Sequence, residues 1–218
     1  MSRVLAQARF DLGTWLRNGE QAVLNILLPL LALAGSSQVQ MTGETRAVLI
    51  TVFAISTSSF AGIAIATAFD RRAGALRIFG ISPLGRRGFV QARLLSAITI
   101  SVVQVAALQG LAVIAHIDFA MPLQMLWVAP LLATAWLSSA LFLASVLRAE
   151  AVLALANLIF IASMASVWVT LTSQSWISFT NPSAAAFRAG LGDLQSLAAI
   201  GIWALVTMVA AIRSFRWE

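Results

Sequence analysis

The chain has 218 residues, of which 60% are hydrophobic and only 10% are charged. Soluble domains carry about 25% charged residues and at most about half apolar ones, so the bilayer is the expected solvent for this chain. Disulfides and thiolate metal sites are excluded because the chain has no cysteine. The formal net charge of +6 comes from arginine alone, since lysine is absent.

The N-terminal segment, residues 1–18, lacks the continuous apolar run of a signal peptide. Leu5, Ala8, Leu12 and Trp15 recur at helical spacing, while arginines and amides occupy other positions on the wheel. This pattern predicts an amphipathic helix that lies in the membrane interface. The alternative is a short solvated arm.

Six segments are apolar enough to cross a bilayer, which takes about 20 residues. They predict one all-α integral membrane domain over residues 1–218 with six transmembrane helices. A seventh apolar stretch, 173–193, is too apolar for a plain loop and predicts one or two short re-entrant helices at the outer interface. The six spans are Gln21–Ser37, Arg46–Phe69, Arg93–Ile117, Leu123–Leu147, Ala151–Thr172 and Leu194–Ile212.

The arginines fix the expected orientation. If both termini lie in the cytosol, twelve of the fourteen arginines are cytosolic, and only Arg46 and Arg188 are outside. Cytosolic loops carry such an excess of basic residues, and this distribution explains the charge without a nucleic-acid partner. We therefore expect a multi-pass protein of a prokaryotic inner or plasma membrane, in contact with membrane lipid.

The loop after the second predicted span holds six of the arginines within residues 70–93, against one acid, Asp70. Asp70 suits the N-cap of a helix, Leu76 and Phe79 share one face, and Gly80 suits the position after its end. The pattern predicts a short cytosolic helix over residues 70–84. The alternative is that the arginines only anchor topology and bind anionic headgroups, as we expect in any case for Arg86, Arg87 and Arg93.

The same loop carries the pattern acid-Arg-x-x-Gly-x-Leu, followed after five residues by Ser/Thr-Pro-Leu. It runs here from Asp70 to Leu76 and then from Ser82 to Leu84. This resembles the permease subunits of ABC-2 type exporters, which more often begin the pattern with glutamate. Weaker likenesses are the stretch from Arg17 to Glu20, Leu28-Pro29-Leu30, and Asn181-Pro182 with Arg188.

The resemblance implies a six-span permease that pairs with a second permease copy, as a homodimer or heterodimer, and with ATP-binding cassette ATPase subunits. The loop helix would then sit in a groove of the ATPase, with Leu76 and Phe79 as apolar contacts and Arg71, Arg72 and Arg77 facing acids. The implied coupling residues are Asp70, Arg71, Arg72, Gly74, Leu76, Arg77, Phe79, Ser82, Pro83 and Leu84.

The residues argue against catalysis by this chain. A P-loop needs a lysine on the phosphates, so ATP and Mg are expected on the partner ATPase and no cofactor on this chain. The single histidine, His116, cannot supply a two-histidine zinc motif. With Asp118 it predicts a polar pair at the interface, and a catalytic dyad is the alternative.

Polar residues within the spans are candidates for a transport path, with helix packing as the alternative reading. The candidates are Asn25, Ser56, Ser59 and Asn157. No charged residue lies mid-span, which disfavours ion coupling and favours an apolar or amphipathic cargo, such as a lipid or drug. The predicted function is the membrane subunit of an ATP-driven exporter, and the alternatives are a non-transporting membrane scaffold or assembly protein, or an intramembrane enzyme.

Overall fold

The computed structural model describes residues 3–17, 19–77, 84–173 and 176–215, and every regular element within these ranges is helical. The elements are α1 (Arg3–Arg17), α2 (Gly19–Ser36), α3 (Gly43–Ser56), the π-helical turn η1 (Thr57–Ala61), α4 (Gly62–Arg72), α6 (Gly85–Ile114), α7 (Met125–Val146), α8 (Ala149–Thr172), the 3-10 helix η2 (Trp176–Phe179), α9 (Pro182–Gly190) and α10 (Leu194–Ser214).

Within the described residues, five helical segments are long and apolar enough to cross a membrane, which agrees with the predicted all-helical, multi-pass architecture. The remaining predicted span corresponds to α2, where the described apolar helix is the shorter stretch Asn25–Ser36. A sixth crossing therefore stays a prediction. The five segments are Gly43–Arg72, Arg87–Ile114, Met125–Val146, Ala149–Thr172 and Leu194–Ser214.

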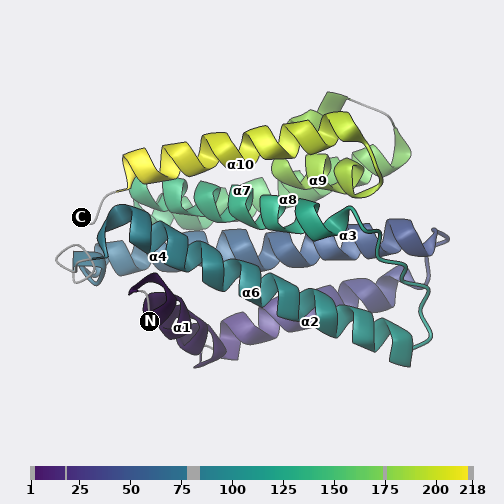
Figure 1. Cartoon of the computed structure of the whole chain (residues 1–218), viewed down its shortest axis with the longest axis horizontal. Helices are drawn as coiled ribbons and strands as arrows, with labels where there is room; N and C mark the ends of the chain where they lie inside the picture. The colour runs from purple at the N-terminus through teal and green to yellow at the C-terminus, as the bar shows by residue number, and fades with distance from the viewer. Residues whose placement is uncertain (1–2, 18, 78–83, 174–175, 216–218) are drawn as a thin grey trace.

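The long helices run side by side, and α1 lies at the same end of the bundle as the C-terminal end of α10 (Figure 1). We call this the α1 end; it also holds the connection between α4 and α6. The loop between α2 and α3, the loop between α6 and α7, and the short helix α9 lie at the opposite end, which we call the α9 end (Figure 1).

Helix α7 lies at the centre of the molecule and packs against α3, α4, α9 and α10. Its buried face alternates small and large side chains, so neighbouring helices approach closely. Trp136 of α7 packs against Phe60 of η1, with ring centroids 4.3 Å apart and the rings tilted by 44°. Its indole donates to the hydroxyl of Ser183 in α9 at 3.0 Å, and this hydroxyl lies 2.9 Å from that of Ser56 in α3.

Two short helices, η2 and α9, occupy the predicted re-entrant segment between α8 and α10. Asn181 caps α9 by accepting from the Ala184 amide at 3.0 Å, and Pro182 takes the first helical position, a favoured place for proline. Most of α9 is buried against the long helices. The two helices lie within the segment for which short helices were predicted, and their re-entrant placement in a membrane stays a prediction.

Candidate functional site

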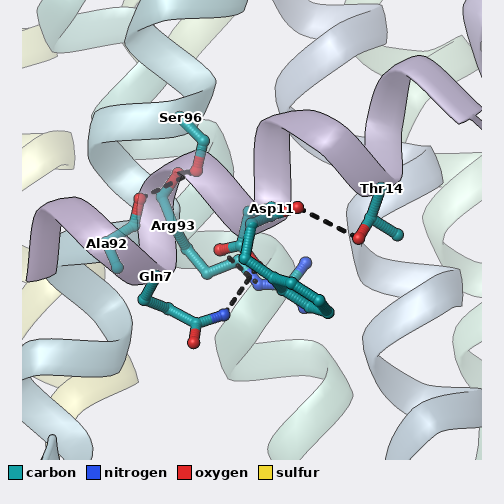
Figure 2. A network of polar contacts seen from close by, with 7 residues as sticks. Gln7, Asp11, Thr14, Ala92, Arg93 and Ser96 are labelled. Atoms are coloured by element: carbon teal, nitrogen blue, oxygen red, sulfur yellow. Dashed lines mark hydrogen bonds and ion pairs between the residues drawn. The ribbon is translucent and has the colours of Figure 1, made fainter. Parts of the chain in front are cut away.

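Helix α1 docks on α6 through one buried ion pair at the α1 end. Arg93 Nε of α6 lies 3.4 Å from Asp11 Oδ2 of α1, with the side chains 19% and 8% exposed. Gln7, one turn earlier, donates to Asp11 Oδ1 at 2.9 Å. Figure 2 shows these side chains meeting between the two helices. Helix α1 lies where the N-terminal amphipathic helix was predicted, and its position in a membrane interface stays a prediction.

The ion pair leaves three polar atoms without a hydrogen-bond partner among the described residues. They are Asp11 Oδ2, Arg93 Nε and the indole Nε1 of Trp15, all of them buried. The guanidinium of Arg93 also lies over the Phe89 ring, 5.3 Å from its centroid. Arg93 is therefore not the headgroup anchor predicted from the sequence, because it faces inward and holds α1.

Burial raises the pKa of Asp11 above its ordinary value of 3.8, against the opposing effects of Arg93 and the Gln7 hydrogen bond. The charge of Asp70 adds to this rise in pKa. Asp11 was not among the predicted site residues. Its signal in the sequence is an acid placed within the apolar stripe of α1, one turn after Ala8 and one turn before Trp15.

Two cavities adjoin this ion pair. The first, of about 630 Å³, lies between α1, α4 and α6 and is lined by Asp11, Asp70 and Arg93 among others. The second, of about 410 Å³, lies between α1, α2 and α6 and has an almost wholly apolar lining. Asn25, a predicted pathway residue, lines the second cavity and is 8% exposed. Both volumes are in the range of small-molecule sites.

The end of α4 differs from the helix predicted over residues 70–84. Asp70 is not an N-cap, because it lies in the last turn of α4. Gly74 takes a left-handed conformation (φ 75°) at the position after the helix end, and the Ala75 and Gly74 amides donate back to the carbonyls of Asp70 and Arg71 at 2.9 and 3.0 Å. This Schellman arrangement ends the second span. A carboxylate near a helix C-terminus is unfavourable by roughly 0.3–1 kcal/mol, so Asp70 does not stabilise its own helix.

Leu76 is not an exposed contact for another protein, contrary to the prediction. It is 1% exposed and packs in a cluster with Phe89, Leu137 and Phe215, against which Leu84 is partly buried. Three other predicted coupling residues, Phe79, Ser82 and Pro83, lie outside the described residues, as does the predicted helix end at Gly80.

The predicted coupling arginines have different surroundings. Arg71 donates to the backbone carbonyls of Ser145 and Leu147 at the end of α7, so it caps a neighbouring helix. Arg72 pairs with Glu150 of α8 at the surface. Arg77 is exposed, as is Arg87 at the start of α6.

The other predicted pathway residues do not line these cavities. Ser56 is fully buried, and its hydroxyl bonds the Val52 carbonyl at 2.7 Å in addition to Ser183. Ser59 is also fully buried, with its hydroxyl unpartnered among the described residues. Asn157 is exposed on α8 and donates to the Leu153 carbonyl at 2.9 Å. The sequence suggested that Asn157 faces the interior of the helix bundle. The composition of a membrane helix does not show which of its faces packs against other helices, so the exposed position of Asn157 could not be predicted.

The α9 end holds a structural arginine. Arg46 of α3 is 7% exposed and donates to the Asp118 carbonyl at 2.7 Å, which ties the two loops at this end together. His116 has φ 53° at the end of α6, where its amide donates to the Val113 carbonyl at 3.2 Å. This is a helix-ending position, and the described residues contain no cluster of metal-binding side chains.

No family model matches this chain, and no curated protein matches it. The fold defines a multi-pass, all-helical membrane protein with a buried ion pair and two adjoining cavities at the α1 end.

Proposed function

We propose that this chain is the membrane-spanning subunit of an ATP-driven exporter, coupled to a separate ATPase that binds ATP and Mg. One observation carries the proposal: α1, the last turn of α4, the start of α6 and the last turn of α10 all carry arginines, and these helix ends lie together at the α1 end (Figure 1). An arginine-rich end is the side that faces the cytosol. It is also the side from which a soluble ATPase could drive a chain that has no P-loop.

We propose a polar contact with the ATPase. Leu76 is buried, and among the described residues near the α4–α6 connection the exposed side chains include Arg77 and Arg87. Complementary acids on the ATPase would set orientation and association rate. In this arrangement Arg71 and Leu76 hold the connection to the bundle, and Arg77 and Arg87 meet the partner.

A second permease copy fits the exposed face of α8. Asn157 lies there among exposed apolar side chains, with Leu158 62% and Ile161 64% exposed. An amide on a lipid-facing surface is unfavourable, and amides are common where membrane helices associate. We propose this face for the contact between the two copies.

The experiment is reconstitution of the full chain in nanodiscs with a P-loop ATPase, taken from the neighbouring gene where that gene encodes one. We expect a stable complex with vanadate-sensitive ATP hydrolysis. We also expect Arg77→Glu to weaken association about tenfold, equivalent to ~1.4 kcal/mol. Gln38→Glu, on an exposed residue of the α9 end, is the matched control and should leave association unchanged.

A wild-type chain that forms no complex with any P-loop ATPase would overturn the exporter proposal. That outcome would favour the non-transporting scaffold. A complex that Arg77→Glu and Gln38→Glu affect equally would contradict the proposed contact surface.

A further inference from the structure

The two cavities at the α1 end are neighbours. Trp15 and Ile100 line both of them, so the charged cavity between α1, α4 and α6 lies next to the apolar cavity between α1, α2 and α6. A site with one charged part and one apolar part matches an amphipathic molecule. The charged part is lined by residues of α1, which lies at the arginine-rich end (Figure 1).

The apolar cavity has the length of one acyl chain in a leaflet. Along α6 it is lined from Thr99 to Leu111, which is about 18 Å at the rise of an α-helix. One leaflet contributes about half of a ~30 Å hydrocarbon core. The cavity is thus about as long as the hydrocarbon part of one leaflet is thick.

The charged cavity presents groups of both signs. Asp11 Oδ2 and Arg93 Nε pair with each other at 3.4 Å but form no hydrogen bond, and the Asp11 side chain is 8% exposed. Trp15 Nε1 has no hydrogen-bond partner among the described residues. Asp70 lines the same cavity and adds a second carboxylate. A buried polar atom without a hydrogen bond is costly, so a ligand that brings a cation to the two carboxylates and an acceptor to Arg93 and Trp15 would add the hydrogen bonds that are missing here.

We propose that this cleft binds a bilayer phospholipid with a primary ammonium headgroup, such as phosphatidylethanolamine. Its ammonium group donates to the carboxylates of Asp11 and Asp70, and its phosphate accepts from Arg93 and Trp15. One acyl chain occupies the apolar cavity between α2 and α6.

The donor set distinguishes this lipid from others. A choline headgroup has no N–H to give to Asp11, and a glycerol headgroup leaves two carboxylates beside an anionic lipid without a cation. The site does not depend on the exporter role, because it needs only α1, α2, α4 and α6.

The test is native mass spectrometry of the delipidated full chain, titrated with ethanolamine, choline and glycerol phospholipids that share the same acyl chains. We expect the ethanolamine lipid to bind at least about tenfold more tightly than the other two, a factor that corresponds to ~1.4 kcal/mol. Asp11→Asn keeps the acceptor for Gln7 and should remove this preference.

Two tryptophan variants of adjacent residues test the position of the chain. Ala107 lines the apolar cavity, whereas Ala106 lines a different cavity, between α6 and α7. Ala107→Trp should abolish lipid binding and Ala106→Trp should leave it unchanged, with equal thermal unfolding of the two variants as evidence of folding. Equal affinity for the three lipids, tighter binding of the glycerol lipid, or wild-type binding by Ala107→Trp would overturn the proposal. Failure to bind an ATPase would not affect it.

Discussion

At the scale of single residues, two neighbouring arginines at the end of α4 make contacts of different value. Arg71 donates two charge-assisted hydrogen bonds to carbonyls at the end of α7, where a cation is favourable. Arg72 forms a surface pair with Glu150 in which both side chains are 63% exposed, and such pairs contribute little. Both side chains carry the same charge, so burial decides which of the two contributes more to the stability of the protein.

We therefore expect Arg71→Ala to destabilise the protein by about 1.5–3 kcal/mol, the range for hydrogen bonds to charged groups. Arg72→Ala, the matched control, should cost at most about 1 kcal/mol. Thermal unfolding of the detergent-solubilised chain measures both. Equal effects of the two variants would contradict the helix-capping role of Arg71.

The stability of the corner between α9 and α10 depends on pH through Asp193. Its carboxylate caps α10, accepting from Ser196 Oγ at 2.6 Å and from the Gln195 amide at 3.1 Å. The Ser196 hydrogen bond is the main cause that lowers the pKa of Asp193 below its ordinary value of 3.8, against the opposing effect of burial. As the pH falls, Asp193 therefore takes up its proton at a higher pH in the unfolded chain than in the folded chain. The stabilisation by the Asp193 carboxylate is complete above the ordinary pKa of an aspartate and is lost as the pH falls below it.

Hydrogen exchange at the first turn of α10 should therefore be constant from neutral pH down to about the ordinary pKa of an aspartate and speed up below it, after correction for intrinsic exchange. Asp193→Asn retains a capping side chain and should show no such transition. A transition that persists in Asp193→Asn would assign it to another group.

At the scale of elements, α1 is held by close packing in addition to its ion pair. Ala8 is 2% exposed on the helix that docks on α6, whereas Ala6 is exposed. A larger side chain at position 8 must push α1 away from α6, at a cost of about 1–3 kcal/mol.

Ala8→Leu should accordingly increase proteolysis and hydrogen exchange of α1, and Ala6→Leu should change them little, within about 0.5 kcal/mol. Because the proposed lipid site is built partly by α1, Ala8→Leu should also weaken ethanolamine-lipid binding. A tightly docked α1 in Ala8→Leu would show that the interface adapts.

The sequence predicted the long helices well because apolar runs of this length have one stable solution in a bilayer. The prediction for the connection after α4 was wrong at its start, for a reason that lies in the local sequence. Asp70 and Gly80 suggested the two ends of a new helix, but the arginines at 71 and 72 followed by Gly74 are equally a helix-ending pattern, and Gly74 ends the span in this way. The burial of Leu76 depends on Leu137 and Phe215, far away in the sequence, so no local pattern reveals it.

At the scale of the whole molecule, the two ends of the bundle should face opposite compartments. The chain has no cysteine, so Gln38→Cys at the α9 end and Arg87→Cys at the α1 end each introduce a single thiol on an exposed residue. A membrane-impermeant maleimide should label Gln38→Cys in intact cells and Arg87→Cys only after permeabilisation. The cysteine-free parent gives the background, and labelling of both from outside would contradict the orientation.

The burial of Leu76 has a mechanical consequence. A loop without contacts to the bundle would move independently of it. Here Leu76 packs against the bundle directly after the end of α4. A load applied near Arg77 passes through Leu76 into side chains of α6, α7 and α10, and close-packed interiors are stiff and transmit strain. The residues directly after α4, up to Leu76, thus form a rigid joint, at which a small push moves three helices together.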